Sequence, residues 1–163
     1  MVHPDRSTEE IHLHIRMAKS DLFLLASSIL LQIILALFIG HAYDMRIFMA
    51  TGYLVGTGQN PYIAQDLSAV FHNSGFKGIT TLGYFPPWAM VLGLIYLVTY
   101  QLIPNFLFYN LAIKLPIIAA NICLAYLVVS ILRRLGLREK IVRWTWIFLL
   151  LNPFLLLMSS AWG

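Results

Sequence analysis

Charged side chains are scarce in this sequence. They make up 11% of the 163 residues, whereas hydrophobic residues make up 60%; in a soluble domain about a quarter of the residues are charged. The scarcity argues against a soluble domain and predicts an all-α polytopic membrane protein. The net charge of +4 is gathered in short clusters. We interpret these clusters as signals of membrane topology and expect no nucleic-acid partner.

Other absences exclude several kinds of site. The single cysteine, Cys123, lies in an apolar run, so the chain cannot form an internal disulfide and the cysteine does not reveal the compartment. The sequence has no metal-ligand cluster, no Cys-x-x-Cys pair, no phosphate-binding glycine loop and no serine elbow. Common soluble-enzyme signatures therefore do not identify a site here.

The first 21 residues lack the basic start and early apolar core of a cleavable signal peptide. Ser7 and Glu10 instead have the spacing of a capping box, and apolar residues follow at helical spacing. We predict a cytoplasmic helix over 1–21 that lies on the membrane surface. It leads into a transmembrane module over 22–163.

Four apolar stretches predict membrane helices, at about 22–43, 85–103, 106–132 and 144–160. The first has about 20 residues, the length that crosses a ~30 Å hydrocarbon core. Prolines mark both ends of the second, as is common where helices start and stop. Apolar residues after Asp44 recur at helical spacing, which predicts a short juxtamembrane helix directly behind it.

The basic residues leave two topologies open. The segment 133–143 is the richest in Lys and Arg, so the positive-inside rule places it in the cytoplasm. If all four stretches cross, the segment 41–84 is cytoplasmic too. If 85–103 is immersed without crossing, 41–84 forms an outer loop on the extracellular or luminal face. The second topology places slightly more basic residues inside, but charge alone does not decide between the two. We prefer the second, because the double proline and short length of 85–103 suit a helix that is immersed on the outer side without crossing.

Asp44 stands at the boundary of the first apolar run, where a partly desolvated carboxylate can act as a general base or stabilise developing positive charge. The alternative is a solvated anchor at a helix end, paired with Arg46. His41 and Arg46 flank the carboxylate. The planar guanidinium of Arg46 is suited to holding a phosphate, and its alternative role is snorkelling to the membrane surface.

Five further side chains are candidates for a binding pocket. Asn60 and Tyr62 form either a proline turn or a wall for a sugar ring, and Tyr84 belongs either to such a wall or to an interfacial aromatic belt. Lys114 lies inside an apolar span, where an ammonium is by default a functional hypothesis. Asn121 follows two turns along the same helical face. The alternatives for Lys114 are snorkelling to the outer surface or pairing with an acid. Together, the two residues would form either a polar stripe facing the protein interior or a helix–helix contact.

Short motifs follow one another in a characteristic order. They run from Tyr-Asp through Asn-Pro-Tyr, Tyr-x-Pro-Pro, Pro-Asn, Lys-x-Pro, a basic loop and Leu-Asn-Pro to Ser-Ser-Ala-Trp-Gly. The order resembles the N-terminal part of the GT-C superfamily of membrane glycosyltransferases. The greatest likeness is to the mannosyltransferase branch that contains the catalytic subunit of GPI mannosyltransferase I and its prokaryotic relatives. The resemblance covers about 22–163.

The resemblance implies transfer of a hexose, with mannose as the first candidate, from a polyprenyl-phosphate donor to an acceptor hydroxyl on the outer or luminal face. It implies that Asp44 is the catalytic base and that Tyr84, Lys114 and Trp162 line the substrate pocket. Arg46 or Lys114 would neutralise the leaving phosphate. Some relatives use a divalent metal. Position 46 is Arg where many relatives carry an acid, so both a metal-free and a metal-containing site stay open.

Relatives continue beyond the Trp-Gly motif into further spans. We therefore expect an N-terminal part or half of a split enzyme, with a second chain supplying the other spans. The expected location is the plasma membrane or the endoplasmic reticulum, in contact with membrane lipid. One rival hypothesis is a non-catalytic subunit that binds lipid or scaffolds a complex. Another is a small transporter with Lys114 and Asn121 in its substrate path.

Overall fold

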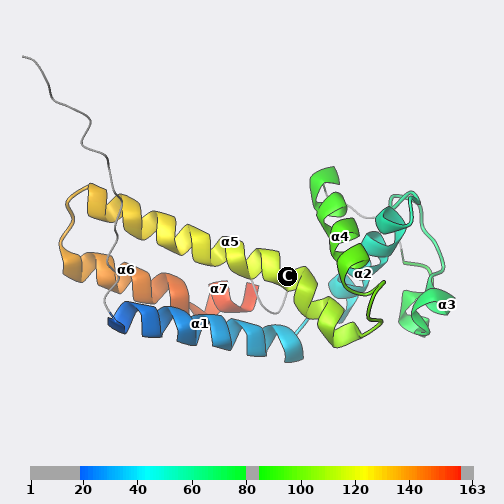
Figure 1. Ribbon diagram of the computed structural model, residues 1–163, viewed down its shortest axis with the longest axis horizontal. Coiled ribbons are helices and arrows are strands. Elements are labelled where there is room, and N and C mark those ends of the chain that lie inside the picture. Colours follow the sequence, from blue (N-terminus) through cyan, green and yellow to red (C-terminus); the bar gives the residue numbers. More distant parts are fainter. Residues whose placement is uncertain (1–18, 80–84, 159–163) are drawn as a thin grey trace, which may run out of the picture.

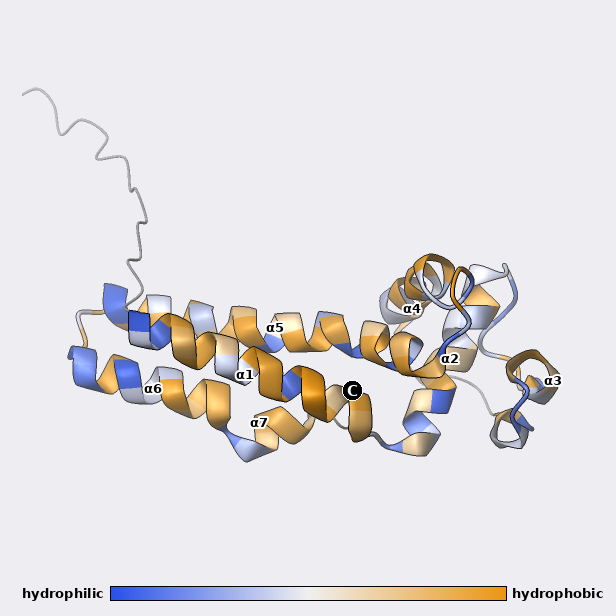
Figure 2. Ribbon diagram, turned by 60° about the horizontal axis from the view of Figure 1, so that its bottom comes forward, coloured by the Kyte–Doolittle hydropathy of each residue, from blue (hydrophilic) through white to orange (hydrophobic). Residues whose placement is uncertain are grey.

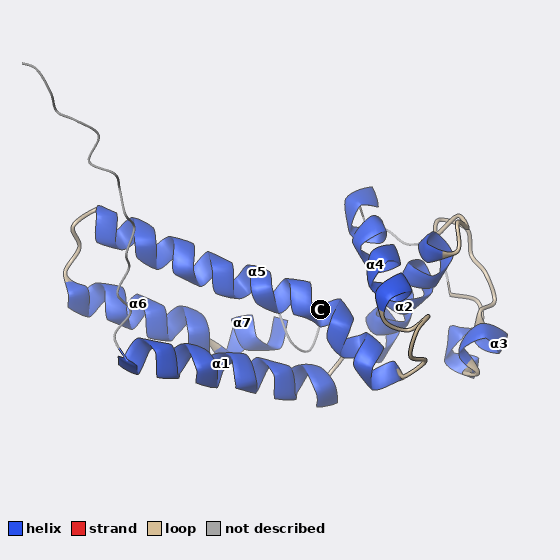
Figure 3. Ribbon diagram, in the orientation of Figure 1, coloured by secondary structure: helices blue, strands red, loops and turns tan. Residues whose placement is uncertain are grey.

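The computed structural model describes residues 19–79 and 85–158. Within these ranges the chain is helical apart from connections and one isolated antiparallel bridge between Gln65 and Ile79 (Figure 3). The predicted surface helix over 1–21 lies almost entirely outside the described residues. Tyr84 and Trp162 lie outside them as well.

Three long helices form an antiparallel bundle (Figure 1). They are α1 (Lys19–Phe38), α5 (Phe106–Arg134) and α6 (Glu139–Leu151), which continues after a break as α7 (Pro153–Leu157). The helices α1 and α5 and the segment Glu139–Leu157 are each long and apolar enough to cross a membrane. For the described residues, this confirms the predicted all-helical fold with long apolar helices that could span a membrane.

The outer surface of the bundle is apolar. Phe23 and Phe38 of α1 are 76% and 80% exposed, and many Leu and Ile side chains of α5 and α6 also face outward. Polar residues gather instead at the end where α5 connects to α6 (Figure 2). An apolar surface of this extent is suited to a lipid environment rather than to water.

Two helix boundaries differ from the predictions. The first span ends at Phe38 rather than at 43, because Gly40 and the residues around it interrupt the helix. The predicted basic loop over 133–143 is shorter in the structure, where only residues 135–138 lie between α5 and α6. The acidic Glu139 stabilises the positive end of the α6 dipole, so the helix starts before the predicted 144. Gly136 makes the tight connection with a positive φ of 70°.

A second group of helices covers the opposite end of the bundle, which we call the cap end. It comprises α2 (Ala42–Gly56), α3 (Ser68–Phe71), the 3-10 helix η1 (Ser74–Phe76) and α4 (Pro86–Val98). The predicted juxtamembrane helix is therefore confirmed as α2, although it includes Asp44 rather than following it. The cap end is held by an aromatic cluster of Tyr53, Phe71, Phe76, Tyr96, Tyr100, Phe106 and Tyr109.

The length of α4 bears on the two topologies. Its 13 residues measure about 20 Å at 1.5 Å per residue, which is short of a ~30 Å hydrocarbon core. The start of α1 and the α5–α6 connection lie together at the other end of the bundle, which we call the basic end (Figure 1). This is the arrangement predicted for three crossings. Which end faces the cytoplasm stays a prediction.

Glycines allow α2 and α4 to approach closely. A Cβ atom on Gly52 would lie 2.7 Å from the carbonyl oxygen of Leu92 and would collide with the Tyr109 hydroxyl. A Cβ atom on Gly93 would lie 2.6 Å from Cγ1 of Val55. This tight crossing fixes α2, the helix that carries Asp44, against the rest of the cap end.

We expect Gly52→Ala to lower the free energy of unfolding by about 2–3 kcal/mol, the cost of overpacking against backbone that cannot move alone. The change also displaces the Tyr109 hydroxyl, which donates to the Met49 carbonyl at 3.0 Å. Unfolding in detergent micelles measures the effect. Gly58→Ala is the control: its Cβ meets no atom within 4 Å, and its φ of 73° predicts a loss of only about 1 kcal/mol. Equal losses of unfolding free energy in Gly52→Ala and Gly58→Ala would contradict a tight crossing of α2 and α4 at Gly52.

Candidate functional site at the cap end

Asp44 lies in the first turn of α2, where the chain leaves the bundle. His41 occupies the N-cap position of this helix without a capping bond from its side chain, and its Nδ1 lies 2.9 Å from Oδ2 of Asp44. The carboxylate side chain is 31% exposed and the imidazole 50% exposed. A carboxylate in the first turn also stabilises the helix dipole. The structure thus places Asp44 as a half-buried, accessible acid paired with His41.

Arg46 is held by backbone carbonyls. Its Nε donates to the carbonyl of Ala42 at 2.9 Å, and its Nη1 donates to the carbonyl of Gly75 at 3.1 Å. These bonds tie α2 to the segment containing η1. The predicted alternative of an Asp44–Arg46 pair is therefore not the arrangement in the structure, because the carboxylate pairs with His41.

A depression of about 330 Å³ lies between the end of α1, the start of α2, η1 and the start of α5. Its walls are mainly apolar, with Phe38, Met45, Phe76 and Phe106 among them, and Arg46 is one of its polar residues. Asn110 of α5 is another. The Nδ2 group of Asn110 donates to the Ala36 carbonyl at 2.9 Å, whereas its buried Oδ1 accepts no hydrogen bond from the described residues.

Asp44 and Arg46 lie on different sides of α2. Two residues along an α-helix are separated by about 200° around the axis. Arg46 lines the depression together with Ala42, Met45 and Met49, and Asp44 does not. The two side chains are neighbours in sequence, but the helix directs them apart.

Asn60 and Tyr62 lie beyond the far end of α2. Oδ1 of Asn60 accepts the backbone N–H of Tyr62 at 2.9 Å, which is an Asx turn. Tyr62 is 40% exposed. Because α2 has 15 residues, about 20 Å of helix separates this turn from Asp44. The structure does not bring these two residues to the Asp44 site, and their contact with a substrate stays a prediction.

Lys114 is fully buried between α5 and α1. Its ammonium donates to the carbonyls of Ala36 at 3.1 Å and Ile39 at 2.6 Å. The last turn of α1 contains no basic residue of its own, and the final carbonyls of a helix lack partners within it. Lys114 supplies both hydrogen bonds and a positive charge at the negative end of the α1 dipole.

Asn121 also faces α1. Its Nδ2 lies 3.4 Å from Oε1 of Gln32, Gln32 donates to Ser28 at 3.2 Å, and the Ser28 hydroxyl donates to the carbonyl of Leu150 at 2.7 Å. The predicted helix–helix contact is therefore present for both Lys114 and Asn121. A role for either in a substrate pocket stays a prediction.

Sequence reasoning did not single out Asn110, Gln32 or Ser28. A usable signal was present for Asn110, which precedes Lys114 by four residues and so shares its helical face. Gln32 was visible as an amide inside an apolar run. Gln32 contacts Asn121 of α5, and Ser28 contacts the Leu150 carbonyl of α6. No local pattern in the sequence reveals these distant partners.

A carboxylate in the loop after α2 and a phenol in the connection between α4 and α5 have shifted pKa values. The Ser68 hydroxyl and backbone N–H donate to Asp66, and these hydrogen bonds hold the pKa of that carboxyl below its usual range. Burial raises the pKa of the Tyr100 hydroxyl. Neither group lines the depression beside α2.

Among the described residues, His, Cys, Asp and Glu side chains form no group of three that could hold a metal ion. The donors at Asp44 are one carboxylate and one imidazole, so we derive no step through a metal. Comparison of the chain with protein-family models, curated proteins and solved structures gave no match. The resemblance to GT-C glycosyltransferases therefore stays a prediction from the order of the motifs.

Proposed function

We propose that this chain binds a polyprenyl-phosphate-linked sugar at the cap end and serves a membrane glycosyltransferase reaction. The reaction moves a hexose, with mannose as the first candidate, to an acceptor hydroxyl. The proposal combines the order of the sequence motifs with the chemistry of the depression beside α2.

The composition of the depression is the observation that carries the proposal. A lipid-linked sugar phosphate has a hydrocarbon chain, an anionic phosphate and sugar hydroxyls. The depression offers apolar walls and the Arg46 guanidinium, and its lining includes Asn110, whose buried Oδ1 has no partner among the described residues. An amide oxygen accepts a hydroxyl hydrogen, and a guanidinium binds phosphate oxygens in a planar fork. Few other ligands would use the apolar walls, the guanidinium and the amide together.

In the proposed reaction, Asp44 takes the proton of the acceptor hydroxyl as the oxygen attacks the anomeric carbon. The bond between that carbon and the phosphate oxygen breaks, and polyprenyl phosphate leaves with the electron pair. Arg46 stabilises its negative charge. Asp44 approaches from the opposite side of α2, so the acceptor must reach the sugar around the start of that helix.

A non-catalytic lipid-binding subunit is the second candidate. The position of Asp44 favours it, because that carboxylate does not line the depression that holds Arg46. In this alternative the depression binds the lipid-linked sugar and another protein carries out the transfer.

We expect Arg46→Gln to weaken donor binding about tenfold, or roughly 1.4 kcal/mol, through the loss of one charged phosphate contact. The full chain in lipid nanodiscs would be mixed with radiolabelled mannosyl-phosphoryl-polyprenol. Retained label measures binding, and release of label to water or to a set of sugar acceptors measures transfer. Lys77→Gln removes an exposed cation of the cap end that does not line the depression, and binding should be unchanged.

The two candidates predict different results for the unaltered chain. Binding together with transfer supports the glycosyltransferase. Binding without transfer overturns the enzymatic proposal and supports the subunit. Equal effects of Arg46→Gln and Lys77→Gln would show general charge attraction and would overturn both.

A further inference from the structure

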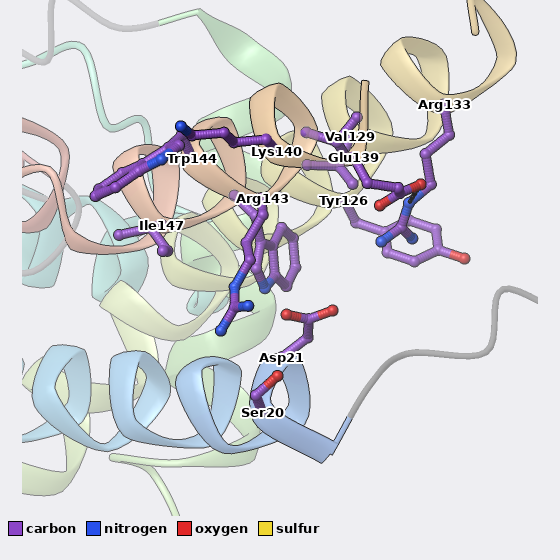
Figure 4. Close-up of a pocket in the computed structure, with 12 residues that line it drawn as sticks. Ser20, Asp21, Tyr126, Val129, Arg133, Glu139, Lys140, Arg143, Trp144 and Ile147 are labelled. Atoms are coloured by element: carbon purple, nitrogen blue, oxygen red, sulfur yellow. Dashed lines mark ion pairs between the residues drawn. The ribbon is translucent and has the colours of Figure 1, made fainter. Parts of the chain in front are cut away.

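A second hollow, which we call the basic groove, lies at the basic end of the bundle, far from Asp44. It has a volume of about 620 Å³ and lies between the start of α1, the last turns of α5 and the first turns of α6. Figure 4 shows Arg143 extending from α6 towards Ser20 and Asp21 of α1, while Arg133 descends from α5. The proposed glycosyltransferase reaction uses none of these residues.

The basic groove is apolar inside and charged at its rim. Val129, Val142 and Ile147 contribute apolar side chains to its lining, whereas Arg133, Lys140 and Arg143 contribute three cations. Two acids, Asp21 and Glu139, also line it. Glu139 lies 3.7 Å from Arg133 in a long ion pair. The cations outnumber the acids, so the rim favours an anionic group.

Trp146 is an independent sign that the basic groove is a binding site. It lines the basic groove and is only 4% exposed, and its indole Nε1 has no hydrogen-bond acceptor in the described part of the chain. A buried donor without an acceptor is unfavourable, and native structures rarely leave one. A ligand oxygen in the groove would satisfy it.

We propose that the basic groove binds one anionic phospholipid. The phosphate and glycerol oxygens would lie among Arg143, Arg133 and the Trp146 indole, and the acyl chains would follow the apolar surface of the bundle. A membrane-spanning helix ends at the depth of lipid headgroups, where basic pockets between helices recognise anionic lipids. A free anion would not use the apolar lining, which favours lipid as the source of the phosphate.

Native mass spectrometry of the purified full chain tests this proposal, with phosphatidylglycerol and phosphatidylcholine as the two probes. We expect the first phosphatidylglycerol to bind about tenfold more tightly than phosphatidylcholine. We expect Arg143→Gln to weaken that binding about five- to tenfold, the range for one basic residue near a lipid headgroup. Arg143 is exposed, so the substitution should leave the fold intact.

Arg138→Gln is the matched control, because it removes the same charge from the α5–α6 connection at a residue that does not line the basic groove. It should leave lipid binding unchanged. Trp146→Phe keeps an aromatic ring without the N–H and should weaken phosphatidylglycerol binding. Equal binding of the two lipids, equal losses from Arg143→Gln and Arg138→Gln, or unchanged binding by Trp146→Phe would each overturn the proposal.

Discussion

Asp44→Asn is expected to lower the rate of sugar transfer by about 10²–10⁴-fold, the usual contribution of a general base. The amide has nearly the same shape as the carboxylate but cannot take the acceptor proton. Donor binding should be unchanged, because Arg46 and the depression lie on another side of α2. Single-turnover transfer in nanodiscs, followed together with retention of the labelled donor, measures the two effects separately.

Asp66→Asn provides the control for this experiment. Asp66 is also a cap-end carboxylate, and it accepts hydrogen bonds from the backbone N–H and the hydroxyl of Ser68 at the start of α3. Its substitution should leave transfer unchanged. Full activity of Asp44→Asn would exclude Asp44 as the base. A parallel loss of donor binding would instead assign Asp44 to the structure of the α2 start, where it pairs with His41.

The helices of the bundle could be predicted because each is a local property of the sequence. Long apolar runs set α1 and α5, and the third crossing was predicted from the run after the basic segment. The predicted ends of the helices were less accurate, because a helix end depends on single residues. Gly40 stops α1 early, and Glu139 starts α6 before the predicted position.

Partners across the bundle could not be predicted in the same way. Asn152-Pro153 breaks α6, and beyond the break the backbone N–H of Phe154 donates to Oδ1 of Asn152 rather than to the Leu150 carbonyl four residues earlier. The Ser28 hydroxyl, 122 residues away in sequence, donates to this carbonyl. The sequence shows the break and the serine but contains no signal that pairs them.

The candidate site was predicted only in part. Its place beside the end of the first span follows from sequence, as does the juxtamembrane helix that carries Asp44. The separation of Asp44 from Arg46 also follows from helical spacing once α2 is known to include both. The depression could not be predicted, because it requires α1, η1 and α5 to meet, and those contacts are set by packing.

Lys114→Met should lower the free energy of unfolding by about 2 kcal/mol, because hydrogen bonds to charged groups contribute roughly 1.5–3 kcal/mol each. Methionine has a similar length, and it carries no charge to desolvate. The absence of this desolvation cost offsets part of the stability lost with the hydrogen bonds. It cannot replace the donor to the Ile39 carbonyl, whereas the Ala36 carbonyl keeps Asn110 as a partner. Unfolding in micelles, compared with Lys140→Met at an exposed position of α6, measures the effect.

Asn121→Ala removes a polar contact between α5 and α1 that is weaker than the one made by Lys114. Its amide lies 3.4 Å from Gln32, near the limit for a hydrogen bond, and comparable contacts in membrane proteins contribute about 0.6 kcal/mol. The loss should therefore be several-fold smaller than for Lys114→Met. If Lys114→Met retained full stability but lost donor binding, Lys114 would be a binding residue rather than a cap for α1. Loss of stability with normal binding of the labelled donor would assign the buried ammonium to the fold.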